Sequence, residues 1–408
     1  MKYNNNLPLH IIVVSDSHLL SSQLHDKGEM IRRISQKGDG KVLPYSEEIF
    51  AAFTHQILAD PPNVLILTGD LSYNGERQSH LDLISYLEKM KAAGIKVLVI
   101  PGNHDINISS AAAFSKNQAW LTETVNHQEF FDLYGGFGYD AAIDQDSSSF
   151  SYVTELTDQL WLVTIDVNSQ HNPRLVSDQT FQWLETALKK AKTLGKTVIT
   201  ATHQNILVHN QQFVKGFVIE NHLKLSKLLN QYQVRLNLSG HIHLQHLVLE
   251  EKGLSEAATG SLAISPHPVG HIIIDESLHL HYETKNLDVT SWAKQYPTHD
   301  KNLQEFSTFS REYFYNISAS KTGAELLKDP TIQQADLIRM AEFSAEVNRA
   351  YFSGKLHQLL PNPIAHPDYL LWQKLGQHIG FWKNLNSFFL QPLKDETTFS
   401  LSLLPANG

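Results

Sequence analysis

Short runs of apolar, mostly β-branched residues recur along the first two-thirds of the chain, separated by amphipathic stretches. The apolar runs predict buried strands, and apolar positions three or four residues apart predict helices. The expected strands are residues 10–14, 64–67, 96–100, 150–156, 160–167, 197–201 and 234–238, followed by two or three more through Val248, Ala257, 272–274 and 278–281. The expected helices are residues 46–58, 81–91, 178–191 and 220–232. This alternation indicates an α/β fold with a parallel or mixed sheet wrapped by helices.

Two segments interrupt this pattern. Residues 21–41 are polar and contain three glycines, which predicts a surface loop long enough to overhang the end of the first strand. Residues 106–146 have weak periodicity, and Gly135-Gly136-Phe137-Gly138 breaks it further, so we expect an irregular insertion. The two strands that follow this insertion are separated by only three residues, which predicts a hairpin.

The character of the chain changes after Leu287. Aromatic and charged residues mix, strand patterns disappear, and helical patterns cover residues 335–351 and 369–389, with a loop at 361–367. We therefore expect two domains, an α/β domain at 1–290 and a helical C-terminal domain at 291–408, the second of a size common for domains.

Composition narrows the classes of function. The 408 residues carry 33 Lys and Arg against 42 Asp and Glu, a net charge of −9 without a long basic run, so polymeric nucleic acid is not an expected partner. No window has the roughly 20 apolar residues of a membrane span, and the first ten residues do not resemble a signal peptide. We expect a soluble cytoplasmic protein, the alternative being an exported one whose signal has been removed. The oligomeric state is not predicted.

Cysteine is absent, whereas histidine occurs 22 times. The chain therefore has no disulfide, no thiolate nucleophile and no zinc–thiolate site. Any bound metal must be held by His, Asp, Glu and Asn side chains.

Polar side chains follow five of the expected strands. These strand ends carry Asp16 and His18, Gly69-Asp70, Gly102-Asn103-His104-Asp105, His203, and Gly240-His241-Ile242-His243. Because ligands bind at the carboxyl ends of strands in open α/β sheets, the five ends could converge on one crevice.

The residue types at these ends suit a pair of metal ions. Two metals about 3.5–4 Å apart need a bridging carboxylate and several oxygen or nitrogen ligands each. Asp16 and His18 stand two residues apart and so point to the same side of an extended segment, as do His241 and His243. Asp70 is the natural bridge, since its glycine neighbour permits close backbone approach and a carboxylate has two oxygens.

The order Asp-x-His, Gly-Asp, Gly-Asn-His-Asp, His and Gly-His-x-His resembles the calcineurin-like metallophosphoesterase superfamily. All five blocks are present in the family's order between residues 16 and 243. The resemblance implies a four-layer α/β/β/α sandwich for residues 1–290, with the helical domain after it. Within the superfamily, Gly69–Glu76 and Ser239–His243 are similar to bacterial class III-type cyclic-nucleotide phosphodiesterases, and Phe309–Asn316 is similar to the helical tail of one bacterial subgroup.

Carried over residue by residue, the resemblance implies the following roles. One metal is held by Asp16, His18 and His243, the other by Asn103, His203 and His241, and Asp70 bridges the two. His104 is no ligand; it faces the substrate and can protonate the leaving oxygen. The implied reaction is attack of a metal-bridging hydroxide on a small anionic phosphodiester, with a cyclic nucleotide as the favoured substrate.

Several alternatives remain open. Manganese or iron is the favoured metal for a mixed imidazole and carboxylate set, with zinc as the alternative. The same centre would also serve a phosphomonoesterase or nucleotidase, and a scaffold without turnover is a third reading. Among the other polar residues, we expect Asp105 to order its turn and Asp166 to be structural; Asn74 could contact substrate or cap a helix, and His267 could line the pocket.

Overall fold

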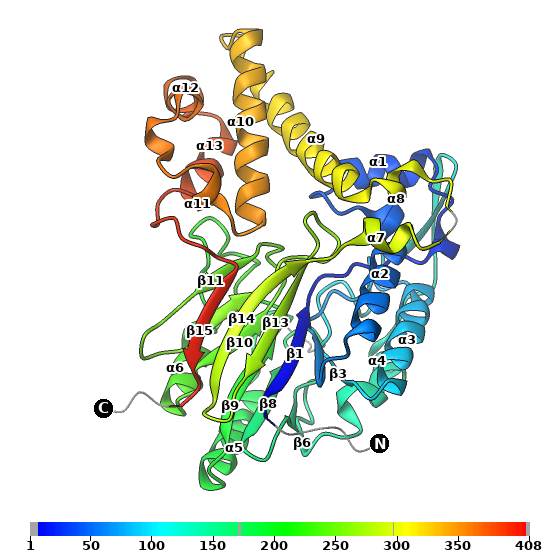
Figure 1. Cartoon of the computed structure of the whole chain (residues 1–408), viewed down its shortest axis with the longest axis vertical. Coiled ribbons are helices and arrows are strands. Elements are labelled where there is room, and N and C mark those ends of the chain that lie inside the picture. Colours follow the sequence, from blue (N-terminus) through cyan, green and yellow to red (C-terminus); the bar gives the residue numbers. More distant parts are fainter. Residues whose placement is uncertain (1–6, 170–172, 297, 405–408) are drawn as a thin grey trace.

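Two mixed sheets packed face to face form the centre of the computed structural model, which describes residues 7–169, 173–296 and 298–404 (Figure 1). The first sheet has six strands in the order β15 (Thr398–Ser402), β14 (His279–Asn286), β13 (Pro268–Ile274), β1 (Leu9–Val14), β2 (Val64–Leu67) and β3 (Lys96–Val99). The second has seven, in the order β11 (His246–Val248), β12 (Ser255–Ala258), β10 (Leu236–Ser239), β9 (Thr197–Thr202), β8 (Leu160–Ile165), β7 (Tyr152–Glu155) and β6 (Asp144–Gln145).

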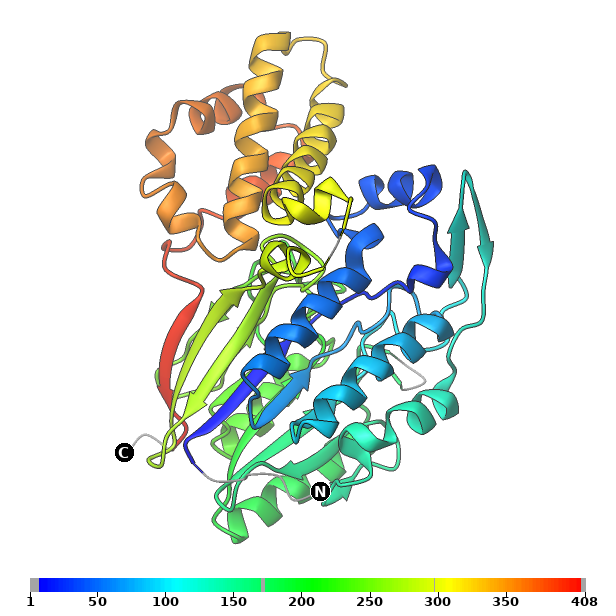
Figure 2. The ribbon, with the colours of Figure 1, turned by 45° about the vertical axis from the view of Figure 1, so that its right-hand side comes forward.

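Helices cover the outer faces of this pair of sheets. Figure 2 shows α2 (Ser46–Ala59) and α3 (Arg77–Ala92) lying across β1, β2 and β3. On the other side, α5 (Asp178–Thr193) and α6 (His222–Gln231) pack with the seven-stranded sheet in one apolar cluster. The predicted four-layer α/β/β/α sandwich is therefore confirmed.

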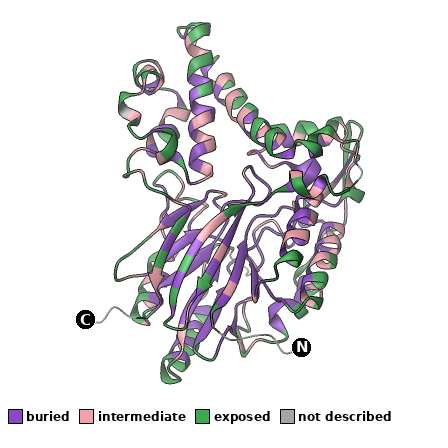
Figure 3. Cartoon of the chain, viewed as in Figure 1, coloured by how far each residue is buried: buried purple, intermediate pink, exposed green. Residues whose placement is uncertain are grey.

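The sequence of β8 shows why two sheets stack here. Successive side chains of a strand point to opposite faces. Leu160 and Leu162 accordingly join the cluster between the sheets, whereas Trp161 and Val163 join the cluster under α5 and α6. All six residues of this strand are buried, as in other strands covered on both faces (Figure 3).

Parallel pairing brings the functional strand ends to one edge. β1, β2 and β3 are parallel neighbours, and Val14, Leu67 and Val99 are aligned across them. β8, β9 and β10 are parallel neighbours in the other sheet. The turns that follow β1, β2, β3, β9 and β10 therefore all leave the same edge of the sandwich.

The two segments expected to be irregular contain regular structure. Residues 21–41 include a short 3₁₀ turn and helix α1 (Glu29–Lys37). Residues 106–146 form a hairpin of β4 (Ala112–Ser115) and β5 (Gln118–Leu121), then helix α4 (His127–Tyr134), a π-helical turn and β6. Helix α4 begins with a capping box, in which the side chains of Asn126 and Glu129 each bind the other's backbone N–H. The expectation of an irregular insertion is therefore wrong for most of its length.

The C-terminal region is helical, as expected, up to its last strand. Its helices are α7 (Val289–Ala293), α8 (Lys301–Gln304), α9 (Phe306–Leu326), α10 (Gln334–Phe352), α11 (Leu356–Leu359), α12 (Pro367–Leu375) and α13 (Gly380–Ser387). The single helix expected at 369–389 is two helices, because α12 ends at Leu375, directly before Gly376. After them the chain returns to the first sheet, where β15 pairs antiparallel with β14. The boundary between 290 and 291 stays a prediction.

No helix in the described ranges is both long enough and apolar enough to cross a membrane.

Candidate metal centre

The turns at the common strand edge bring all seven predicted metal ligands together. Asp16 and His18 follow β1, Asp70 follows β2, Asn103 follows β3, His203 follows β9, and His241 and His243 follow β10. Six of these residues form two groups that share Asp70, and within each group the ligand atoms lie within 4.8 Å of one another. The seventh, Asn103, places its amide oxygen 3.1 Å from Nε2 of His203.

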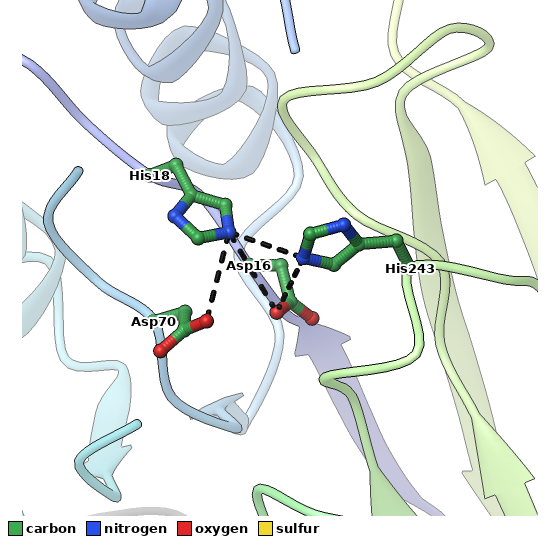
Figure 4. A group of neighbouring side chains, drawn as sticks. All are labelled: Asp16, His18, Asp70 and His243. Atoms are coloured by element: carbon green, nitrogen blue, oxygen red, sulfur yellow. Dashed lines mark hydrogen bonds and ion pairs between the residues drawn. The ribbon is translucent and has the colours of Figure 1, made fainter. Parts of the chain in front are cut away.

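The first group consists of Asp16, His18, Asp70 and His243. Figure 4 shows these side chains pointing toward one another. Nε2 of His18 lies 3.1 Å from Nε2 of His243, which in turn lies 3.2 Å from Oδ1 of Asp16. Oδ2 of Asp70 closes the group at 3.6 Å from Nε2 of His18.

The second group consists of Asp70, His203 and His241, with Asn103 beside it. Nε2 of His203 lies 3.3 Å from Oδ1 of Asp70 and 3.2 Å from Nδ1 of His241. The two oxygens of Asp70 thus face different groups, Oδ2 the first and Oδ1 the second. This is the arrangement that a bridging carboxylate requires.

Hydrogen bonds on the far side of the rings fix which nitrogen faces the centre. Nδ1 of His203 donates to the carbonyl oxygen of Thr68 at 2.7 Å, and Nε2 of His241 donates to that of Gly216 at 2.8 Å. In the neutral rings the opposite nitrogens, which are 3.2 Å apart, both carry lone pairs. Two nitrogens at this distance need a cation between them, either a proton or a metal ion, so these residues fit a metal ion.

A buried oxygen without a partner supports the same fit. Asp16 is fully buried. Its Oδ2 accepts from the backbone N–H of His241 at 2.9 Å, whereas in the described part of the chain its Oδ1 makes no hydrogen bond, although it lies 3.2 Å from Nε2 of His243. An unsatisfied buried carboxylate oxygen is costly, and a metal ion would satisfy it.

The electrostatics of the cluster favour positive charge. Burial alone would raise the pKa of Asp16 and of Asp70, but the neighbouring imidazoles of His243 and His203 hold the pKa of both carboxyls below the usual range. Burial also lowers the pKa of His203, yet Asp70 outweighs it and raises that pKa to about 9. For His241, burial dominates and lowers the pKa to about 4.

The backbone at the centre adopts an uncommon conformation. Five of the seven predicted ligands have positive φ angles between 40° and 66°: Asp16, His18, Asp70, His241 and His243. Residues other than glycine rarely adopt this region, and such strain concentrates at functional sites. Two glycines also permit close approach, because a Cβ on Gly102 would collide with Asp70 and a Cβ on Gly240 with Ser15 and Asp16.

Sequence reasoning missed Asp39 and Lys41. Oδ2 of Asp39 accepts from Nδ1 of His243 at 2.8 Å, which turns Nε2 of that ring toward the centre, and pairs with Nζ of Lys41 at 3.0 Å. Both residues belong to the segment that overhangs the strand edge. Its polar composition indicated a functional loop, but nothing in the sequence connects Asp39 with a histidine 204 positions away.

The remaining residues of the Asn103-His104-Asp105 turn have separate contacts. The carboxylate of Asp105 accepts from the backbone N–H groups of Leu71, Ser72 and Gly102 at 2.7–3.1 Å, which confirms that it orders the turn. Nδ1 of His104 donates to the amide oxygen of Asn74 at 2.8 Å. Asn74 therefore orients the ring of His104. It does not cap helix α3, whose N-cap position is occupied by Glu76.

Two other candidates lie outside the cluster. Asp166 is buried and accepts from the backbone N–H groups of Phe150 and Asn168, which confirms its structural role. His267 lines a different cavity from the one that contains Asp70 and His104.

Comparison with known proteins defines the family. Residues 9–245 match the family model described as calcineurin-like phosphoesterase. The chain belongs to this family. A second match covers residues 288–396 and is described as the C-terminal domain of cyclic nucleotide phosphodiesterase. The predicted superfamily and the prediction of a phosphoester hydrolase are thus confirmed, and the second match supports the phosphodiester class. Membership also implies two metal ions, which the side-chain cluster fits.

Over the longer alignments, this phosphoesterase shares only low sequence identity with individual proteins. It is 26% identical over 243 residues to a 3′,5′-cyclic-nucleotide phosphodiesterase of Nostoc sp., an alignment that covers 59% of this chain and 73% of the relative. It is 44% identical over 55 residues to a probable cyclic nucleotide phosphodiesterase of Vesicomyosocius okutanii, covering 14% of this chain and 22% of that protein. A solved dimetal phosphatase of Danio rerio aligns with 69% of this chain and 97% of its own at 13% identity and a TM-score of 0.48.

Proposed function

We propose that this phosphoesterase hydrolyses a cyclic nucleotide at a dinuclear metal centre. In this proposal the first metal ion is held by Asp16, His18 and His243, the second by Asn103, His203 and His241, and both by Asp70. Manganese or iron is the proposed metal, because the donor set mixes imidazole with carboxylate. When bound, the two ions polarise phosphoryl oxygens and make water a better nucleophile at neutral pH.

The observation that carries the proposal is the composition of the cavity over these ligands. It has a volume of about 280 Å³, and its walls combine Asp70, Asn103 and His104 with three half-buried phenylalanines, Phe213, Phe217 and Phe352. The rings of Phe213 and Phe217 lie 5.5 Å apart. Aromatic side chains stack on nucleobases, so a cavity with ligands at one wall and phenylalanines at the others suits a nucleotide.

Protein side chains supply the remaining steps. His104 lines the cavity next to Asp70 and is the group proposed to protonate the leaving oxygen, with Asn74 fixing its ring through Nδ1. Lys41 lines the same cavity and presents an ammonium group for the anionic substrate. Phe352 comes from α10, so the helical region contributes one wall of the proposed substrate site.

The deciding experiment compares substrates of different classes. Metal-free protein reloaded with Mn²⁺, Fe²⁺ or Zn²⁺ is assayed with cyclic nucleotides and with bis- and mono-p-nitrophenyl phosphate. We expect the highest kcat/KM for a cyclic nucleotide. A clear preference for monoesters would establish the phosphomonoesterase alternative, and no turnover of any phosphoester would establish the scaffold.

A variant of Phe352 tests the proposed base contact. Because stacking on an aromatic side chain contributes roughly 1–3 kcal/mol per base, we expect Phe352→Ala to lower kcat/KM for the cyclic nucleotide at least about fivefold. Phe389→Ala is the matched control, since Phe389 lies in the same helical region outside the cavity lining. Equal kinetics for both variants would contradict a base site at Phe352.

A further inference from the structure

Helix α9 of the C-terminal region packs against the segment that overhangs the strand edge. The hydroxyl of Tyr313 on α9 donates to Oγ of Ser35 on α1, and that hydroxyl donates to the carbonyl oxygen of Lys41 at 2.9 Å. Just beyond the segment, the ring of Tyr45 lies 5.4 Å from that of Phe309. Figure 1 shows α9 passing beside α1. Parts of the chain 278 positions apart are thus joined beside a residue that lines the cavity over the metal ligands.

Phe314, the next residue of α9, packs directly on Gly40. Phe314 is 3% exposed, and a Cβ on Gly40 would lie 2.5 Å from Cδ2 of its ring. Gly40 is buried and has a φ angle of 105°, a conformation that other residues rarely adopt. The neighbours of Gly40 in the chain, Asp39 and Lys41, both line the cavity over the metal ligands. The ring of Phe314 therefore limits how closely this part of the overhanging segment approaches α9.

The same ring also contacts helix α10. The centroids of the rings of Phe314 and Phe352 are 5.1 Å apart, with 57° between their planes. The carbonyl oxygen of Phe352 accepts from the backbone N–H of Gln245 at 3.0 Å, two residues after His243. Phe352 thus braces the turn that carries His243. Phe314 lies between this brace and the residue next to Asp39, so it contacts the supports of both partners in the hydrogen bond between Asp39 and His243.

We infer that Phe314 is a positioning residue for the first metal group, because it holds the two segments that this hydrogen bond joins. It acts through Asp39, whose Oδ2 accepts from Nδ1 of His243 at 2.8 Å. A donor–acceptor distance of roughly 3.6 Å is no longer a hydrogen bond, so a shift of Asp39 by about 1 Å would release the ring of His243. The inference rests on the proposed metal centre, but not on the identity of the substrate.

Titration of the metal-free, full-length protein with Mn²⁺, followed calorimetrically, tests this role. We expect Phe314→Ala to weaken one of the two binding steps about tenfold, at the lower end of the roughly 10–100-fold typical of a lost orienting partner. The matched control is Phe343→Ala, which removes the same ring from a buried site on α10 that does not line the cavity. Phe314→Leu and Phe343→Leu repeat the comparison with a smaller loss of volume, so the test does not depend on the folding of the alanine variants.

A double variant separates positioning from a general loss of structure. If Phe314 acts through Asp39, Phe314→Leu adds no further loss of metal affinity once Asp39→Ala has removed the carboxylate. Independent effects would instead add and would overturn the inference, as would equal affinities in the Phe314 and Phe343 variants. A wild-type protein without two Mn²⁺ binding steps would overturn the proposed centre and this inference together. Two steps in wild type without turnover of a cyclic nucleotide would overturn the proposed substrate alone.

Discussion

Asp39 offers the sharpest test of how the first metal group is held. Its carboxylate accepts from Nδ1 of His243 at 2.8 Å and thereby orients the nitrogen proposed to bind metal. Removing such an orienting partner typically costs 10–100-fold in metal affinity, or about 1.4–2.8 kcal/mol. We therefore expect Asp39→Ala to lose 10–100-fold in affinity for one of the two metal ions. Asp39→Asn should lose less, because its amide oxygen can still accept the hydrogen bond.

Titration of metal-free protein with Mn²⁺, followed calorimetrically and by elemental analysis, measures this effect. The first group contains His243 and the second does not, so only one binding step should weaken. Glu29→Ala is the control, since it removes an exposed carboxylate from the same overhanging segment without contact to the cluster. Two unchanged binding steps in Asp39→Ala would refute the reasoning, and so would equal weakening of both.

Three further predictions concern the turns at the strand edge. Asn103→Ala should reduce metal content, whereas His104→Ala should keep both metals and lower kcat by about 10²–10⁴-fold; equal metal loss in elemental analysis would refute this division. Gly240→Ala should displace the Asp16 carboxylate, because the added Cβ collides with it, and lower the free energy of unfolding by about 1–3 kcal/mol. Thermal unfolding and metal content measure this effect, and a melting temperature and metal content equal to those of wild type would contradict it. Burial raises the pKa of Glu76 from 4.5 to about 7, so the folded protein binds more protons than the unfolded chain between these values and loses stability as the pH rises through them. The free energy of unfolding of Glu76→Gln should therefore rise by on the order of 3 kcal/mol relative to that of wild type as the pH goes from 4.5 to 8, as measured by denaturant unfolding. A difference that stays constant across this range would contradict the pKa shift.

Local sequence predicted the strands and helices that bury a clear apolar pattern. The strand at 64–67 has its predicted bounds, and the helix at 46–58 ends within one residue of the prediction. Helix α1 was missed although Met30, Ile31 and Ile34 stand at helical spacing and pack into one apolar cluster, because the helix has only nine residues and lies in a polar segment that contains three glycines. Strand β15 was missed because a five-residue strand is short, and its pairing with β14 depends on residues over a hundred positions away.

The candidate centre was easier to predict than its surroundings. Asp16 and His243 are far apart in sequence, but each occupies a strand end, and parallel strands bring such ends to one edge. The residues that support the centre follow no such rule. Asp39 and Asn74 act through hydrogen bonds to His243 and His104, and no spacing rule relates the members of these pairs.

The return of the chain into β15 changes how the helical region can move. Residues between β14 and β15 leave the first sheet at one strand and re-enter it at the neighbouring strand. The region is therefore an insertion held at both ends, and any rigid-body motion is limited to rocking about two adjacent connections. Such rocking would carry Phe352 toward or away from the metal ligands while the sheets stay fixed. Deleting everything after residue 290 would also uncover the backbone of β14 as a new sheet edge, so a deletion that spares 398–402 is the cleaner way to separate the two parts.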